Sequence, residues 1–418
     1  MSITLRHLNA RIRGLHVVPL VLLFYMAVIL VFVRQNFSED GLEDTQHLAS
    51  LTFSSSGNSK LHHRGSLAIS SSGNRRYGKD GGAEDIVFLI ILCEGTPNDN
   101  QGGESASDIA RQLRQAGVLL KSAAALSSTL LKFLVVADSE TLYLQFVNLT
   151  SSWPEEYQKH VVFEYYDVWY PADRQSMRTM FRVCATERLF LPEMFPNLDA
   201  AIYIDTDLVF LRPPEQLWGE FHRFDDVQVA AMAPCLYHYG GRKNKVPFYG
   251  KTGLNAGIMH MNLTRMKNFP DGGWTAANMK VFDKYKKKLR LADQDILNIL
   301  FHEYPDHLYE LGCEWNYRIF QCSQGSNKCP NAASNGISIL HGNAMAFVNG
   351  AEMKLQVVFE AWERHLLGSS LSHFLTSLQK DLFAVTKMHQ PSKCALISNI
   401  DDMLTKELQK HVLVNELH

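Results

Sequence analysis

From residue 85 onward, apolar runs of strand length alternate with longer segments whose apolar residues recur at helical spacing. The runs 86–93, 133–138 and 201–204 are almost continuously apolar, which is typical of strands covered on both faces. The segments 106–128 and 292–304 have the periodicity of amphipathic helices. Further strands are predicted at 160–168, 227–234, 256–262 and 336–340, and a further helix over 177–195 that Pro192 would end. This alternation predicts an α/β fold with a mostly parallel, Rossmann-like sheet flanked by helices.

Residues 16–33 contain no Asp, Glu, Lys or Arg, and at about 1.5 Å per residue they are just long enough to cross a bilayer as a helix. Three arginines precede this run, which favours a cytoplasmic N-terminus and a lumenal body. A cleaved signal peptide is the alternative, but its apolar region is usually shorter and ends at small residues, whereas this one ends in Val-Phe-Val-Arg. We therefore predict an uncleaved transmembrane signal-anchor.

Residues 34–83 are polar and rich in Ser, Gly, Asn and His, a composition that cannot bury enough apolar surface to fold. We interpret them as a flexible stem. The predicted organisation is a cytoplasmic tail at 1–15, a transmembrane anchor at 16–33, a stem at 34–83, a catalytic domain at 84–380 and a C-terminal extension at 381–418. This layout is typical of single-pass type II membrane enzymes of the Golgi or the endoplasmic reticulum, whose catalytic domain is lumenal.

Sequons and cysteines also favour a lumenal body. Three N-x-S/T triplets indicate candidate N-glycosylation sites at Asn36, Asn148 and Asn262. Three of the seven cysteines crowd one polar segment: Cys313, Cys322 and Cys329. They predict a disulfide-stapled loop, with a zinc site as the alternative, although a close C-x2-C pair is missing. Because seven is odd, at least one thiol has no intramolecular partner.

Two carboxylates one residue apart interrupt a buried strand in the sequence "AIYIDTDLVFLRP" (201–213). Carboxylates repel one another and are costly to bury without a partner. No Lys or Arg lies between Arg188 and Arg212, so a divalent cation is the simpler neutraliser. Alternate residues of an extended segment point to the same side, so Asp205 and Asp207 can hold one ion together.

A third ligand is available at His341, which follows the last predicted strand in "SILHGN". A lone histidine is more often a surface or core residue, and it is the combination with the two carboxylates that favours a ligand role. Two carboxylates and an imidazole suit Mn²⁺ better than Mg²⁺, which remains the alternative. An ion with so few protein ligands keeps open positions, which substrate phosphates commonly occupy.

Four blocks, "YIDTDLVFLRP", "LNAGIMHMN", "ADQDILN" and "LHGN", together resemble the retaining nucleotide-sugar glycosyltransferases of family 8, the glycogenin and galactosyltransferase-like enzymes, which have the GT-A fold. Within that family, "FYGKTGLNAGIMHMNLTRM" and "CEWNYR" are most similar to the glucoside xylosyltransferases. The resemblance implies that the three predicted ligands hold Mn²⁺ together with the diphosphate of UDP-xylose. It implies transfer of xylose, with an α linkage, onto O-linked glucose of EGF-like repeats in Notch-type glycoproteins.

The resemblance also implies roles for other residues. Arg188 matches an arginine near the donor sugar, Gln294 matches the residue beneath the anomeric carbon, and Asp293 matches its carboxylate neighbour. The implied donor-binding residues are Cys93, Glu94, Asp205, Thr206, Asp207, Asn255, Ala256, Gly257 and Gly342. Since a glutamine is a poor nucleophile, we favour front-face return, in which the departing phosphate deprotonates the acceptor hydroxyl. Asp293 and Asp295 are the alternative nucleophile or base, and for Asp295 a helix-capping or first-turn role is favoured.

The chain departs from the family pattern in one place. Many members continue after their His-Gly with a phosphate-binding lysine, whereas this chain has no lysine between His341 and Lys354. Lys251, Arg318 or the metal alone would then hold the diphosphate. On the acceptor side, Tyr249, Trp315, Tyr317 and Phe347 could stack on sugar, or they could pack in the core.

Two other functions compete with xylosyl transfer. One is a related enzyme that uses UDP-glucose or UDP-galactose. The other is a membrane-anchored, non-catalytic lectin-like scaffold, which would predict a broken metal site, whereas all three ligands are present. The formal net charge of −2 gives no electrostatic case for nucleic acid as a partner.

Overall fold

The computed structural model describes residues 85–94, 106–180, 184–237, 239, 246–348 and 350–416, which all belong to one compact unit, Gly78–His418. The predicted tail, anchor and stem lie outside the described residues, as does Asn36. Among the described helices, none has the length and apolar character that a membrane span requires.

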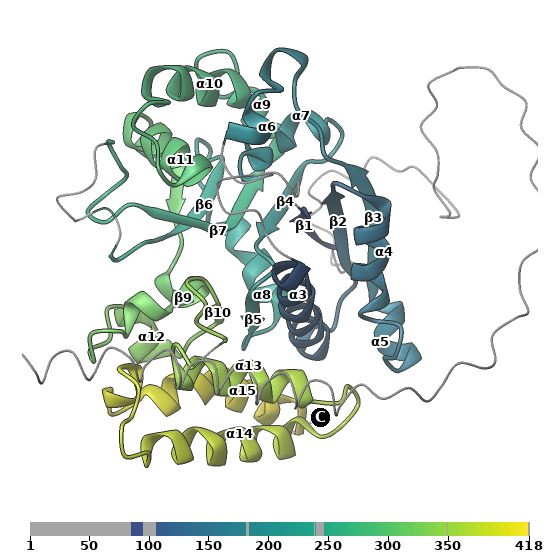
Figure 1. The fold of residues 1–418 in the computed structure, drawn as a ribbon, viewed down its shortest axis with the longest axis vertical. Coiled ribbons are helices and arrows are strands. Elements are labelled where there is room, and N and C mark those ends of the chain that lie inside the picture. Colours follow the sequence, from purple (N-terminus) through teal and green to yellow (C-terminus); the bar gives the residue numbers. More distant parts are fainter. Residues whose placement is uncertain are drawn as a thin grey trace, which may run out of the picture. The chain divides into compact units, whose positions relative to one another are not determined.

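A seven-stranded sheet organises this unit (Figure 1). Its strands, in the spatial order β3-β2-β1-β4-β7-β6-β8, are β3 (Val161–Asp167), β2 (Leu131–Ala137), β1 (Ile86–Leu92), β4 (Ala200–Ile204), β7 (Leu254–Asn262), β6 (Ala230–Pro234) and β8 (Leu308–Glu310). Neighbouring strands pair in parallel except at β7, which runs antiparallel to both β4 and β6. The predicted α/β class with a mostly parallel sheet is therefore confirmed.

Alternate residues of the central strands serve two separate hydrophobic cores. Phe88 of β1 packs into one core with α3 and the C-terminal helices, while its neighbours Val87 and Leu89 pack into the other with α10 and α11. Figure 1 shows these two groups of helices on opposite sides of the sheet. Ahead of the C-terminal helices, the described α-helices are α3 (Ala106–Leu126), α4 (Glu140–Asn148), α5 (Glu155–Lys159), α6 (Met177–Met180), α7 (Leu191–Met194), α8 (Pro214–Trp218), α9 (Leu263–Lys267), α10 (Trp274–Tyr285), α11 (Ala292–Glu303) and α12 (Pro330–Asn335). Burial on both faces explains why the strands are continuously apolar.

The last predicted strand does not join the main sheet. It forms β10 (Ile339–His341), which lies between β5 (Leu208–Phe210) and β9 (Tyr317–Arg318) in a separate three-stranded sheet. β10 runs antiparallel to β5, and its register places His341 opposite Leu208. A residue more than 130 positions away is thereby brought next to the "DTD" triplet.

The predicted helix over 177–195 is wrong as a single element. The segment contains α6 (Met177–Met180), a 3₁₀ turn (Glu187–Phe190) and α7 (Leu191–Met194). Cys184 interrupts it with a backbone φ of 62° and is disulfide-bonded to Cys93. A left-handed residue cannot continue a right-handed helix. Pro192 lies in the first turn of α7, where its missing N–H costs nothing, and does not end the helix.

Three disulfides tie together distant parts of the chain: Cys93–Cys184, Cys313–Cys329 and Cys322–Cys394. The predicted stapled loop is confirmed for all three of its cysteines, and the zinc alternative is wrong because these sulfurs are bonded to one another or to Cys394. The seventh cysteine, Cys235, is a buried free thiol.

The two sequons within the described residues have different surroundings. Asn148 is exposed at the end of α4. The Asn262 side chain accepts a hydrogen bond from the Arg265 N–H at 2.9 Å and caps α9. Asn148 is therefore the more accessible candidate.

A layer of C-terminal helices covers one core: α13 (Met353–Arg364), α14 (Leu371–Thr386) and α15 (Ile400–Glu416). α14 runs across residue 380, so the predicted boundary there falls inside a helix. The fully buried Lys354 ammonium joins the three helices, donating to the Leu382 carbonyl at 2.5 Å, to Thr386 Oγ1 at 2.6 Å and to Asp401. This one cation holds the layer together.

We expect the change Lys354→Met to lower the free energy of unfolding by about 3 kcal/mol, because it leaves buried acceptors and a carboxylate without their cation. Urea unfolding followed by circular dichroism measures this loss. The control is Lys406→Met, which removes an exposed ion pair with Asp402 in the same layer and should cost less than about 1 kcal/mol. Equal losses in both variants would contradict the role of Lys354.

Candidate active site

The three predicted metal ligands meet at the edge of the main sheet. Asp205 and Asp207 follow β4, and His341 ends β10. The His341 Nε2 atom lies 3.5 Å from Asp205 Oδ2 and 3.2 Å from Asp207 Oδ1, and one ligand atom from each residue lies within 4.8 Å of the others. The sequence prediction that these three side chains converge is confirmed.

Gly257 of β7 lets two of these ligands lie directly against the backbone. Its carbonyl accepts the Asp205 N–H at 2.8 Å, so the two backbones are directly paired. A Cβ at this position would lie 2.2 Å from His341 Cε1 and 2.9 Å from Asp205 Oδ2. The close approach of backbone and ligands requires glycine here. The donor set and the cradle fit a divalent cation such as Mn²⁺.

Arg188 neutralises part of the acidic cluster, which the spacing argument from the sequence had missed. Its guanidinium lies 2.5 Å from Asp293 Oδ2 and 3.4 Å from Asp205 Oδ1, and it stacks on the Tyr203 ring at 4.0 Å. The Tyr203 hydroxyl donates to Asp205 Oδ1 at 2.8 Å. The carboxylates of Asp205, Asp207 and Asp293 carry three negative charges, and the single Arg188 guanidinium offsets one of them. One divalent cation would balance the remaining charge.

The pKa values in this cluster follow from burial and pairing. Burial raises the pKa of Asp293 to about 6, although the Arg188 guanidinium acts in the opposite direction. Burial by itself would lower the pKa of Arg188, but Asp293, Tyr203 and Asp205 outweigh it and the pKa rises. Arg188 therefore remains a cation, and at neutral pH Asp293 is mostly its ionised partner.

Asn255 and Gln294, which the resemblance also assigns to the donor sugar, are bonded to each other and to the backbone next to Gly257. The Asn255 amide donates to Gln294 Oε1 at 2.9 Å, and the Ala256 N–H donates to the same oxygen at 3.2 Å. Asp293 lies in the first turn of α11 and does not cap it. Asp295 accepts from the Arg290 and Leu291 N–H groups and from the Tyr239 hydroxyl, and the structural role predicted for it is confirmed.

A cavity of about 600 Å³ opens beside the ligands, a volume typical of small-molecule sites. Cys93, Thr206 and Gly342 line it as predicted for donor-binding residues. Four other predicted donor-binding residues are not among the lining residues: Glu94, Asn255, Ala256 and Gly257. The Glu94 N–H donates to Asp138 Oδ2 at 2.8 Å. The lining residues that sequence reasoning missed are Ile91, Arg111, Gln112, Gln115, Cys184, Ala185, Tyr203 and Asn343 to Met345.

Neither cation suggested for the diphosphate lines this cavity. Arg318 is fully buried and donates to the Cys235 carbonyl at 2.6 Å, and Lys251 is exposed in a turn. The cations among the lining residues are Arg111 and Arg188. Arg111 lies on α3 at helical spacing from other lining residues, a position that only the packing of α3 against β5 reveals.

The aromatic residues suggested for acceptor binding are mostly core residues. Trp315, Tyr317 and Phe347 are at most 1% exposed, so they cannot stack on a bound sugar, and only Tyr249 is partly exposed. The core-packing alternative stated for them is therefore the one that holds for these three residues.

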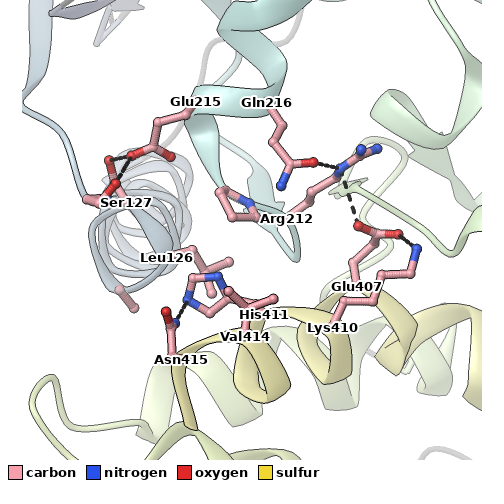
Figure 2. A pocket seen from close by; sticks show the side chains of 13 residues that line it. Leu126, Ser127, Arg212, Glu215, Gln216, Glu407, Lys410, His411, Val414 and Asn415 are labelled. Carbon is pink, nitrogen blue, oxygen red and sulfur yellow. Dashed lines mark hydrogen bonds and ion pairs between the residues drawn. The ribbon is translucent and has the colours of Figure 1, made fainter. Parts of the chain in front are cut away.

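A second cavity of about 470 Å³ lies between the end of α3, α8 and α15 (Figure 2). Figure 2 shows the Glu407 carboxylate between Arg212 and Lys410. Glu407 pairs with Arg212 Nε at 3.2 Å and with Lys410 Nζ at 2.5 Å, and the Ser127 hydroxyl donates to Glu215 Oε1. None of the residues predicted for chemistry lines this cavity. The Arg212–Glu407 ion pair attaches α15 to the body, whereas the Lys410–Glu407 pair lies within α15.

We expect the change Gly257→Ala to abolish transfer and to weaken Mn²⁺ binding at least about 10-fold, because the added methyl displaces His341 and Asp205. Isothermal titration with Mn²⁺ and a transfer assay measure both effects, with a thermal melt to check folding. Gly219→Ala is the matched control, since nothing lies within 4 Å of its Cβ position. Unchanged Mn²⁺ affinity in Gly257→Ala would place the metal elsewhere.

Known proteins resemble this chain over most of the body. Residues 67–345 match the family described as Glycosyl transferase family 8. Glucoside xylosyltransferase 2 of Xenopus laevis is 33% identical over 312 residues, which cover 72% of this chain and 72% of that protein. Glucoside xylosyltransferase 1 of Danio rerio is 36% identical over 272 residues, which cover 62% of this chain and 67% of that protein. The solved apo form of mouse xyloside xylosyltransferase 1 aligns at 17% identity with a TM-score of 0.47, covering 64% of this chain and 100% of that chain. The convergent acidic site and the family match lead to one conclusion: this chain belongs to glycosyl transferase family 8.

Proposed function

We propose that this family 8 glycosyltransferase moves xylose from UDP-xylose, with retention, onto O-linked glucose of EGF-like repeats. The observation that carries the proposal is the convergence of Asp205, Asp207 and His341 beside the Asn255–Gln294 pair. Relatives named glucoside xylosyltransferase support xylose as the donor sugar and glucose as the acceptor sugar. A non-catalytic scaffold would not need this acidic cluster, since unpartnered carboxylates cost stability.

Asp205, Asp207 and His341 would hold the Mn²⁺ ion. When bound, the ion supplies stabilisation of the negative charge that develops on the departing diphosphate. Arg188 holds Asp205 and Asp293 in place and keeps positive charge next to the donor sugar. Asn255 and Gln294 offer amide groups that orient the sugar hydroxyls.

Retention fits a front-face path better than a double displacement. The amide of Gln294 is a poor nucleophile, and its oxygen already accepts two hydrogen bonds. Asp295 is occupied by three donors, and Asp293 is paired with Arg188. The proton of the acceptor hydroxyl would then pass to an oxygen of the departing phosphate.

Arg111 is our candidate for the diphosphate-binding cation that replaces the family lysine. It extends from α3 into the 600 Å³ cavity that holds Asp205 and Asp207. A guanidinium can donate two hydrogen bonds to a phosphate in a planar fork.

We further propose that the enzyme is a single-pass type II protein of the Golgi or endoplasmic reticulum, anchored by residues 16–33. The three disulfides support a lumenal catalytic body, because such bonds persist in oxidising compartments.

A donor panel tests the function. Purified protein is incubated with Mn²⁺, an O-glucosylated EGF repeat and UDP-xylose, UDP-glucose or UDP-galactose in turn, and the product mass is measured. We expect xylose transfer to be fastest. Asp205→Asn and Asp207→Asn should each abolish it, and a chelator should do the same. Fastest transfer of a hexose would assign the chain to a different donor, and no transfer of any sugar would favour the scaffold alternative.

The change Arg111→Gln should raise the KM for the donor about 10-fold, equivalent to about 1.4 kcal/mol, with a smaller effect in Arg111→Lys. Steady-state kinetics at varied donor concentration measures this shift. Arg114→Gln is the matched control, because Arg114 lies on the same helix but pairs with Glu363 outside the cavity. An unchanged KM in Arg111→Gln would leave the diphosphate to the metal alone.

A further inference from the structure

A buried asparagine connects the metal ligands to the residues of the donor sugar. Asn316 is fully buried at the end of the 3₁₀ turn Cys313–Asn316. Its Oδ1 atom lies 2.9 Å from His341 Nδ1, and its Nδ2 atom donates to Asn255 Oδ1 at 2.8 Å. Asn255 in turn donates to Gln294. One continuous chain of hydrogen bonds therefore runs from His341 to Gln294.

Two consecutive backbone N–H groups fix the direction of this chain. The Gly257 N–H donates to Asn255 Oδ1 at 3.2 Å, and the Ala256 N–H donates to Gln294 Oε1 at 3.2 Å. A backbone N–H cannot accept, so the oxygen of each of these two amides must face it. Asn255 Oδ1 can then only accept from Asn316, and Asn316 must turn its NH₂ group toward Asn255.

The oxygen of the Asn316 side-chain amide determines which ring nitrogen of His341 carries the hydrogen. With its NH₂ group committed to Asn255, Asn316 presents its oxygen to His341, so Nδ1 of the ring must carry the hydrogen. In the neutral ring, Nε2 is then the lone-pair atom, and it is the atom that faces Asp205 and Asp207. Three lone-pair donors face one another, as a metal site requires.

The fold holds Asn316 firmly at this position. The Cys313–Cys329 disulfide closes the segment that carries it, and the next residue, Tyr317, pairs with Leu340 in the small sheet. The Gln321 amide donates to the Asn316 carbonyl at 3.3 Å. The backbone that carries the asparagine is therefore tied to the strand that delivers His341.

We propose that Asn316 is a positioning residue that fixes the ligand tautomer of His341 and, through the same amide, the orientation of Asn255 and Gln294 at the donor sugar. It couples the metal side of the site to the sugar side. The inference rests on the proposed function for the roles of the metal and the sugar, but its evidence is the hydrogen-bond chain itself.

Two substitutions of Asn316 distinguish the hydrogen bond made by its amide oxygen from the one made by its NH₂ group. In Asn316→Asp, the carboxylate still accepts from His341 Nδ1, but it meets Asn255 Oδ1 with no hydrogen to donate. In Asn316→Ala, both bonds are lost. We expect Asn316→Ala to weaken Mn²⁺ binding about 10- to 100-fold and Asn316→Asp to keep it within about threefold, while both lower kcat at least about 10-fold. Electron paramagnetic resonance of free Mn²⁺ gives the affinity, and sugar transfer at saturating donor gives kcat.

Asn327→Ala is the matched control. Asn327 lies in the same disulfide loop, where it bonds to the Cys329 backbone and accepts from the Tyr317 hydroxyl at 3.3 Å, and its hydrogen bonds are not to members of the chain from His341 to Gln294. It should leave Mn²⁺ affinity and kcat unchanged, and thermal melts confirm that all three variants fold.

Three results would overturn the proposal. Wild-type affinity for Mn²⁺ in Asn316→Ala would show that the histidine needs no such partner. An equal loss of Mn²⁺ in both Asn316 variants would show that the direction of the chain is wrong. Full kcat in Asn316→Asp would show that the sugar side is not coupled. If the wild type binds Mn²⁺ but transfers a sugar other than xylose, the donor assignment fails, and the role of Asn316 is still tested with that sugar. If the wild type binds no Mn²⁺, the proposed metal-dependent function and the role of Asn316 both fail.

Discussion

The antiparallel pairing of β10 with β5 is the contact on which the candidate site depends. β5 begins directly after the "DTD" triplet, and β10 ends in the histidine, so the register that sets His341 opposite Leu208 also sets the imidazole beside both carboxylates. The pairing also joins β9, and with it Asn316, to the same small sheet. A slip of one residue would turn the histidine to the other face and dismantle the site.

Charge balance explains the rest of the arrangement. Asp205, Asp207 and Asp293 are gathered in a space where Arg188 can serve only two of them. The lack of a side chain at Gly257 lets His341 and Asp205 approach the backbone of β7, and the hydrogen-bond chain through Asn316 leaves the histidine with its lone pair toward Asp205 and Asp207. The site is therefore built as a set of acceptors around one position, which suits an enzyme that must stabilise a departing diphosphate.

The central strands of the main sheet could be predicted because they are buried on both faces and are read from a few consecutive residues. The short edge strand β8 was not predicted, since its three residues are only partly buried. The 177–195 segment could not, because the break at Cys184 comes from a disulfide to a residue 91 positions earlier. Similarly, Trp315 and Tyr317 have the residue types of a sugar-binding surface, and only the fold of their loop buries them. Arg111 escaped notice since an arginine on an amphipathic helix looks like any solvent-exposed one.

The sequence by itself determined the local chemistry: a carboxylate pair at a strand end, a histidine before glycine and four blocks that resemble family 8 enzymes. These features are local because strand burial and motif spacing depend on neighbouring residues. Only the tertiary structure decided which distant groups meet. It brought Arg188 to the carboxylates, Arg111 to the cavity and Asn316 between His341 and Asn255. Those contacts depend on strand register and on disulfides between remote segments, and neither can be read from residue spacing along the chain.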